Sequence, residues 1–249
     1  MLETILFKLN EIEEKYNVVV LYACETGSRA WGFPSPDSDY DVRFVFAFKD
    51  YLTVESPRDV IEFQVDETWD ITGWDLKKSL QLFRGTNSAM LERLNSPIIY
   101  KEIDGFKGKL WDMTPQYFAP KAGMHHYLSM TNNIFTKDLQ TDVVRLKKYF
   151  YALRTSLAAL WIAQNQSVPP MTLGELRVNL PQKLASIMDE MIALKSVSNE
   201  KTEVQKNEEL HDFIQKTMDY CAKVSPNLSV HLNYDNTVIN QFFKEFIPK

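Results

Sequence analysis

The sequence predicts an α+β protein with two domains: an α+β domain over residues 1–110 and an all-helical domain over residues 111–249. Two observations lead to this prediction. Short β-branched and aromatic runs, which are typical of strands, occur before about residue 105. Beyond that point, apolar residues recur at the three- and four-residue spacing of helices. The 249 residues are enough for two modest domains.

The N-terminal part begins with a helix and continues with strands. Residues 2–16 carry apolar side chains at three- and four-residue spacing, which predicts an amphipathic helix. Strands are predicted for the apolar, β-branched segments 18–22, 41–48, 59–65 and 68–74. In the second of these segments, alternation places four side chains on one face: Val42, Phe44, Phe46 and Phe48.

Helices follow the last predicted strand. Asp75 is the expected N-cap of a helix that runs through Phe83, and a further helix is expected from Ser88 to Leu94. The longer helical stretches come next, at residues 115–136, 142–165, 181–195, 207–223 and 237–246. The segment 196–207 is expected to be a polar connector, and the polar run 198–209 is expected to be an exposed loop.

Composition and charge narrow the class of protein. The net charge is −5, and residues 1–110 carry 13 Lys+Arg against 19 Asp+Glu. An acidic N-terminal part suits a metal site and argues against a broad groove for long nucleic acid, which is usually basic. No apolar run is long enough for a membrane span, and the N-terminus lacks the pattern of a signal peptide. Cys24 and Cys221 are far apart in sequence, so we expect a cytoplasmic protein without a disulfide-linked partner.

The most informative pattern is Gly27-Ser28 followed by Asp39-x-Asp41. Glycine lets a backbone approach a bulky anion or adopt a positive φ angle. The Ser28 hydroxyl and neighbouring N–H groups can donate to phosphate oxygens, particularly where a short helix begins. Side chains alternate along a strand, so Asp39 and Asp41 are expected to point to one face.

Two carboxylates on one face repel each other unless a cation neutralises them. Mg²⁺ is the expected cation, with Mn²⁺ as its substitute, because it prefers oxygen ligands and substrate phosphates. Two such ions, about 3.5–4 Å apart, stabilise the attacking and leaving oxygens of an in-line phosphoryl displacement. The alternative for Asp39 and Asp41 is a polar turn that enters a strand. The upstream Gly-Ser favours the metal site.

This segment resembles the signature of the DNA polymerase β-like nucleotidyltransferase superfamily, in which Gly-Ser precedes Asp-x-Asp at a similar distance. The matching residues are Gly27, Ser28, Arg29, Ala30, Gly32, Pro36, Asp37, Ser38, Asp39 and Asp41. Other parts of the chain resemble one branch, the YcgL-like or RlaP-like (RNA-ligase-associated) predicted nucleotidyltransferases. Those parts are Trp31-Gly32-Phe33, Trp69-Asp70-Ile71, Asn87 with Leu91-Glu92, residues 96–100 and residues 147–154. The resemblance implies a palm-like mixed sheet flanked by helices and then a helical domain.

The resemblance also implies a third carboxylate on a later strand, which helps to bind the catalytic metal. The candidates are Glu62, Asp66 and Asp70. Asp70 lies between Trp69 and Ile71, a hydrophobic-Asp-hydrophobic pattern similar to the third site of the superfamily. We therefore expect Asp70 to fill this role, with Asp66 as the alternative.

Five further residues are candidates for nucleotide binding. Arg29 and Arg43 are close in sequence to the acidic pair, and each is expected either to approach the triphosphate or to neutralise the carboxylates. Lys147, Tyr151 and Arg154 recur at four- and three-residue spacing, so they share one face of a helix. In the superfamily, helical domains close over the nucleotide and supply cations to it. The alternative for these three is an ordinary solvated helix face.

Together these patterns predict an Mg²⁺-dependent enzyme that moves NMP from an NTP, with ATP as the expected donor, to an acceptor hydroxyl and releases pyrophosphate. Asp39 and Asp41 would bind the metals, Asp70 would complete the catalytic metal site, and Gly27 and Ser28 would hold the β- and γ-phosphates. RNA is the favoured acceptor, because the family is associated with RNA ligases and RNA repair. A protein or small-molecule acceptor is the first alternative, and a catalytically inactive nucleotide-binding or antitoxin-like protein is the second.

Overall fold

The computed structural model describes residues 1–51, 58–64, 68–178, 180–230 and 235–248. These residues form two compact units. The first contains residues 1–30, 39–117 and 232–249, and the second contains residues 31–38 and 118–231. This division differs from the predicted boundary after residue 110. Aromatic contacts are the reason, because Phe33 stacks on Phe150 within the second unit and Phe242 packs on Phe106 within the first.

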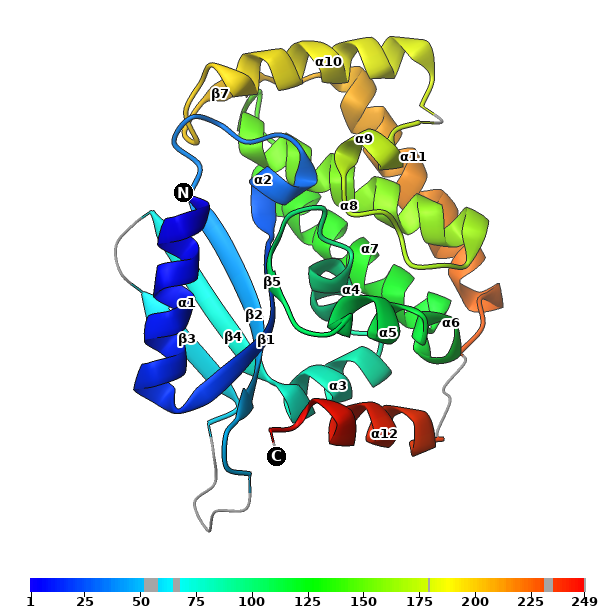
Figure 1. The fold of residues 1–249 in the computed structure, drawn as a ribbon. Helices are drawn as coiled ribbons and strands as arrows, with labels where there is room; N and C mark the ends of the chain where they lie inside the picture. Colours follow the sequence, from blue (N-terminus) through cyan, green and yellow to red (C-terminus); the bar gives the residue numbers. More distant parts are fainter. Residues whose placement is uncertain (52–57, 65–67, 179, 231–234, 249) are drawn as a thin grey trace. The chain divides into compact units, whose positions relative to one another are not determined.

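The first unit is built on a five-stranded mixed sheet with the order β3-β4-β2-β1-β5 (Figure 1). The strands are β1 (Val18–Glu25), β2 (Tyr40–Phe48), β3 (Val60–Gln64), β4 (Trp69–Asp75) and β5 (Ile99–Glu102). β2 and β4 are parallel, and the other neighbours are antiparallel. The predicted α+β class with a mixed sheet is therefore confirmed, and β1 to β4 match the four predicted strands. β5 was not predicted.

Helix α1 (Leu2–Tyr16) covers one face of this sheet (Figure 1). Its buried residues Ile5, Leu9 and Ile12 belong to one apolar cluster with Val42, Phe44 and Phe46 of β2. The predicted alternation of β2 is thereby confirmed. It follows that the residues on either side of Val42, Asp41 and Arg43, point to the face of the sheet opposite α1.

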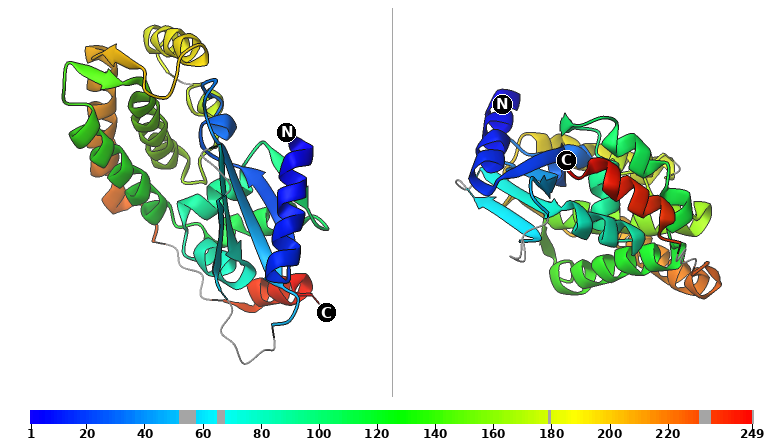
Figure 2. Two further views of the ribbon diagram at one scale, coloured as in Figure 1. Left: turned by 90° about the vertical axis from the view of Figure 1, so that its left-hand side faces the viewer. Right: turned by 60° about the horizontal axis from the view of Figure 1, so that its bottom comes forward.

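Several helices of the first unit lie on the side of the sheet away from α1, and Figure 2 shows α12 (red) beside α3. They are α3 (Leu76–Arg84), α4 (Ser88–Leu94), α5 (Phe106–Trp111), α6 (Thr114–Tyr117) and α12 (Thr237–Phe246). The side chain of Asp75 accepts hydrogen bonds from the first turn of α3, and that of Asn87 caps α4. The predicted N-cap at Asp75 is confirmed. Phe106 stacks on Tyr22 of β1 and packs against α12, so α12 completes this side of the core.

The second unit is mainly helical. Its elements are α7 (Pro120–Asp138), β6 (Val143–Arg145), α8 (Leu146–Asn165), α9 (Leu173–Leu176), α10 (Gln182–Ser196), β7 (Glu203–Gln205), α11 (Glu208–Val224) and the 3₁₀ turn Ser225–Asn227. The predicted helix 115–136 is interrupted before Pro120, which occupies the first turn of α7 because proline lacks an N–H to donate. The predicted exposed connector instead contains β7, which pairs with β6 and buries Val144. No helix among the described residues is long and apolar enough to cross a bilayer.

Candidate active site

Asp41 and Asp70 lie opposite each other on the parallel pair β2 and β4. Both side chains leave the face of the sheet that α1 does not cover, because their neighbours Val42 and Ile71 face the α1 core. Strand pairing thus brings together two of the three carboxylates that the sequence predicted for a metal site.

Arg43 bridges these two carboxylates. Its Nη2 lies 3.1 Å from Asp41 Oδ1 and 2.7 Å from Asp70 Oδ2, and its Nη1 donates to the backbone carbonyl of Asp70 at 2.8 Å. The side chain of Asp70 is 48% exposed, while those of Asp41 and Arg43 are 21% and 18% exposed. Asp70 is therefore the carboxylate most open to an incoming group. Of the two predicted roles for Arg43, neutralisation of the acidic cluster is the one seen in this structure.

Gly27 lies directly against Asp41. Its φ angle is +63°, a left-handed conformation, and a Cβ atom placed on it would lie 1.8 Å from Asp41 Oδ2. Gly27 also begins the short helix α2 (Gly27–Trp31), in which Ser28 is buried. The glycine is thus required both by backbone conformation and by the close approach of the carboxylate. The preceding residue, Thr26, donates both its N–H and its hydroxyl to the Asp41 carbonyl.

Glu25 is a site residue that the sequence analysis missed. It is fully buried at the end of β1, and its Oε1 accepts a hydrogen bond from the Asp41 backbone N–H at 2.8 Å. Its Oε2 accepts a hydrogen bond from the Tyr100 hydroxyl. Burial raises the pKa of Glu25 to about 7, although the hydrogen bonds from Tyr100 and Asp41 oppose that rise. The available signal was an acidic residue that ends an apolar strand next to the Gly-Ser pair.

Arg93 is a second missed residue on this side of the sheet. It lies on α4, is 4% exposed, and its guanidinium stacks 3.3 Å from the ring centre of Trp74. Burial lowers its pKa to about 9, and its charge interacts with those of Arg43 and Asp70. A buried cation here adds positive potential beneath the carboxylate pair. The helical spacing of the sequence did not indicate that Arg93 lies near the carboxylates.

Asp39 lies one residue before β2, and Arg29 lies on α2; neither belongs to the Asp41–Asp70 pair. Arg29 Nε donates to the backbone carbonyl of Asp39 at 2.9 Å, and its guanidinium lies 4.0 Å from the ring centre of Tyr40. Arg29 thereby fixes the backbone of Asp39 and the ring of Tyr40, where β2 begins. Asp66, the alternative third carboxylate, lies outside the described residues. Glu62 on β3 is in register with Thr72 rather than with Asp70.

The predicted nucleotide-binding residues of α8 gather around Trp31 within the second unit. The Trp31 ring packs edge-on against Tyr151 at 5.2 Å, and the Arg154 guanidinium lies 4.4 Å from the Trp31 ring centre. Arg154 is 2% exposed and donates to the Met171 carbonyl at 3.0 Å. Lys147 pairs with Glu200 at 2.9 Å. These contacts hold the signature segment 31–38 on α8, and contact with nucleotide remains a prediction for the three residues.

The same segment is anchored to the predicted connector by a buried polar cluster. Glu200 Oε1 accepts hydrogen bonds from Ser35 at 2.8 Å, from Ser38 at 2.7 Å and from Lys195 at 3.2 Å. Lys195 is 2% exposed. Burial would raise the pKa of Glu200, but the hydrogen bonds from Lys147, Ser38 and Ser35 outweigh it and hold the pKa at about 2.

The two carboxylates of Asp41 and Asp70 supply oxygen ligands of the kind that a hard divalent cation prefers. Asp41 and Asp70 already converge on a single cationic nitrogen, and the absence of a side chain on Gly27 makes room for the Asp41 carboxylate. Within the described residues, no group of three His, Cys, Asp or Glu side chains is gathered for a metal. Asp39 is therefore not clustered with the other two here. Its position one residue before β2 leaves it outside the register that aligns Asp41 with Asp70.

A mixed sheet that carries such a carboxylate pair beside a Gly-Ser turn characterises the protein as a nucleotidyltransferase of the DNA polymerase β class. The chain matches the RlaP family, described as an RNA repair pathway DNA polymerase beta family, over residues 1–245, and it belongs to that family. The superfamily and family predicted from the sequence are thus confirmed.

The known proteins to which this chain is similar include the following two. YcgL of Bacillus subtilis strain 168 is 37% identical over 232 residues, which cover 92% of this chain and 89% of that protein. A solved nucleotidyltransferase-like protein from Exiguobacterium sibiricum 255-15 is 11% identical with a TM-score of 0.31, and the match covers 98% of this chain and 79% of that one. The second similarity is too low to bear on function.

Proposed function

We propose that this protein is an Mg²⁺-dependent enzyme that transfers NMP from an NTP, with ATP as the donor, to an acceptor hydroxyl of RNA. The observation that carries the proposal is the Asp41–Asp70 pair, aligned by strand register and set against Gly27. Asp41 and Asp70 would hold Mg²⁺, or Mn²⁺ in its place, and Asp39 would supply a further carboxylate at the entry to β2. The bound metal would neutralise charge on the triphosphate and lower the pKa of the acceptor hydroxyl.

The residues of the chain would serve an in-line displacement. Gly27 and Ser28 would bind the β- and γ-phosphates through backbone N–H groups and the serine hydroxyl. The acceptor oxygen forms a bond to the α-phosphorus as the bond from that phosphorus to the bridging oxygen breaks. Pyrophosphate leaves with those electrons, and the acceptor proton passes to Asp70, whose partial exposure lets it return the proton to solvent.

The proposal that the acceptor is RNA rests on the family match alone. The RlaP description places the family in RNA repair, which supports RNA. The acidic balance of residues 1–110 supports a cationic small molecule as the alternative, and a protein acceptor of AMP is a further one. Both cysteines are free and buried among the described residues, which supports a reducing cytoplasm as the location.

The test uses the purified full chain, Mg²⁺ and each of the four NTPs labelled at the α-phosphate. RNA, protein and aminoglycoside acceptors form separate arms, and nuclease treatment of the product identifies RNA. Asp41→Asn is expected to abolish label transfer. Asp59→Asn is the matched control, because Asp59 pairs with Lys78 away from the site. Undiminished transfer by Asp41→Asn would overturn the proposal, and stabilisation by Mg-NTP without transfer to any acceptor would favour a catalytically inactive protein that binds nucleotide.

A further inference from the structure

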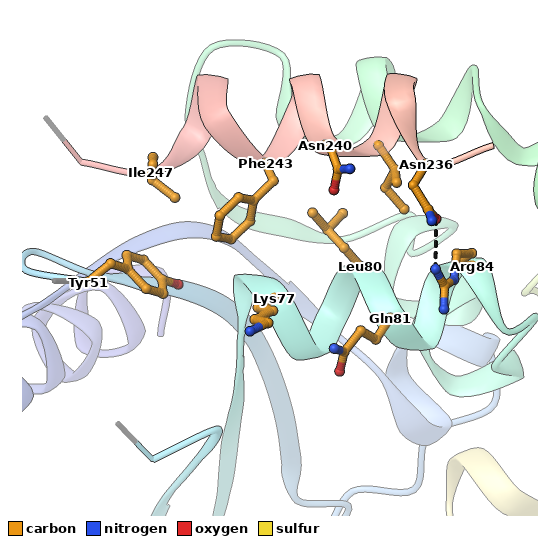
Figure 3. Close-up of a pocket in the computed structure, with 10 residues that line it drawn as sticks. Tyr51, Lys77, Leu80, Gln81, Arg84, Asn236, Asn240, Phe243 and Ile247 are labelled. Carbon is orange, nitrogen blue, oxygen red and sulfur yellow. Dashed lines mark hydrogen bonds between the residues drawn. The ribbon is translucent and has the colours of Figure 1, made fainter. Parts of the chain in front are cut away.

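A pocket apart from the candidate active site opens in the first unit between α3 and α12, and it has a volume of about 500 Å³ (Figure 3). This volume is within the range of small-molecule sites in proteins. The residues that line it are Tyr51, Lys77, Leu80, Gln81, Arg84, Asn236, Ile239, Asn240, Phe243 and Ile247. None of them belongs to the candidate active site.

The two helices present complementary sets of side chains. Lys77, Gln81 and Arg84 recur at four- and three-residue spacing, so they form one ridge of α3. Asn236, Asn240 and Phe243 recur with the same spacing along α12 and its N-cap. The ridges are joined at one end, where Arg84 Nη1 donates to Asn236 Oδ1 at 2.7 Å (Figure 3). Cations thus flank one wall, and amides and an aromatic ring form the other.

The interior of the pocket is apolar. Leu80 and Ile239 are buried, and Figure 3 shows Leu80 and Phe243 directed into the space between the helices. Tyr51 packs against Phe243 with ring centres 5.8 Å apart and an interplanar angle of 73°. The edge-to-face contact fixes the Phe243 ring, which is only half-buried. A fixed, accessible aromatic ring is a stacking platform for a flat heterocycle.

Lys77 and Arg84 are the cations that line the pocket. Within the described part of the chain, neither Lys77 nor Arg84 pairs with a carboxylate, whereas the neighbouring Lys78 pairs with Asp59 at 2.7 Å. Asp75, the closest acidic residue in sequence, caps α3 and accepts a hydrogen bond from Tyr51. Two cations that have no carboxylate partner among the described residues, in a chain of net charge −5, favour an anionic ligand.

We infer that the pocket between α3 and α12 is a second nucleotide-binding site, which takes a nucleoside phosphate. The base stacks on Phe243, the amides of Gln81 and Asn240 hydrogen-bond to its edge, and Lys77 or Arg84 binds the phosphate. The site lies at the Asp75 end of β4, and Asp70 is five residues away along that strand, about 17 Å at the usual rise per residue. It is therefore distinct from the catalytic carboxylates, and the inference does not depend on the proposed reaction.

The experiment measures binding to the full chain by calorimetry in the presence of a chelator. AMP and a short single-stranded oligoribonucleotide are separate ligands, because both carry the same chemistry. AMP lacks the β- and γ-phosphates, and the chelator removes divalent metal, so the catalytic site contributes little. Lys77→Gln/Arg84→Gln is expected to weaken binding at least tenfold and to reduce its dependence on salt. Phe243→Ala is expected to weaken binding by about five- to 150-fold through lost stacking.

Lys244→Gln is the matched control, since Lys244 is an exposed cation of α12 that does not line the pocket. It is expected to bind as the wild type does. Binding of AMP as tight as that of the oligonucleotide identifies a free nucleotide as the ligand, and tighter binding of the oligonucleotide identifies RNA. The inference is overturned if neither ligand binds at millimolar concentration, if the control and the double variant bind equally, or if an acidic peptide binds in preference to both.

Discussion

Replacement of Gly27 by alanine tests the geometry of the candidate active site most directly. The left-handed φ of +63° costs an alanine about 1–2 kcal/mol of the unfolding free energy. The added Cβ would lie 1.8 Å from Asp41 Oδ2, so the carboxylate must retreat by about 1.2 Å to restore a separation of 3.0 Å. That retreat disturbs the ion pair between Asp41 and Arg43. A partly exposed ion pair of this kind contributes about 0–1 kcal/mol to the unfolding free energy.

Gly27→Ala is therefore expected to lower the unfolding free energy by about 1–3 kcal/mol, or the melting temperature by about 2–12 °C for a chain of this size. Misplacement by about 1 Å of the carboxylate that we propose as a metal ligand is expected to lower nucleotide transfer about 100-fold. Thermal melting measures the first effect. Calorimetric binding of Mg-ATP and transfer from labelled NTP measure the second.

Gly105→Ala is the matched control. Gly105 has a similar φ of +71°, but no atom lies within 4 Å of its Cβ position. It is expected to lose similar backbone stability and to keep Mg-ATP binding. If both variants lose Mg-ATP binding equally, or if Gly27→Ala binds and transfers nucleotide as the wild type does, the close approach to Asp41 has no functional role.

Three further predictions concern the carboxylates. Glu25→Ala is expected to lower the unfolding free energy by about 1–3 kcal/mol, because it leaves the buried N–H of Asp41 without an acceptor, while Glu25→Gln retains most of the stability; chemical denaturation compares them. Arg43→Met is expected to make the melting temperature depend more strongly on Mg²⁺, because Asp41 and Asp70 lose their shared cation; an unchanged Mg²⁺ response would argue against metal binding by this pair. The pKa of Glu200 is lowered from its ordinary 4.5 to about 2, so its stabilisation is complete above pH 4.5 and lost as the pH falls toward 2. Glu200→Gln should remove that loss of stability at acid pH, as measured by denaturation curves at several pH values. An equal change of unfolding free energy with pH in both proteins would contradict this prediction.

Much of the fold was predictable because it depends on neighbours in sequence. The alternation of Val42, Phe44 and Phe46 specified a half-buried strand, and the cap at Asp75 specified where α3 begins. β5, β6 and β7 were missed because they are only three or four residues long, and β6 falls within the predicted helix 142–165; pairing with a partner strand rather than their own pattern makes them strands.

The sequence by itself determined the class of the protein, because Gly27-Ser28 and Asp39-x-Asp41 form a local pattern whose spacing is specific. The sequence also indicated Asp70 as the third carboxylate, because the apolar residues Trp69 and Ile71 flank it. Tertiary structure alone decided that Asp70 lies opposite Asp41, since the register of parallel strands is set by packing across the sheet. The roles of buried Glu25 and of the Glu200 cluster likewise depend on contacts between segments distant in sequence, which no local periodicity encodes.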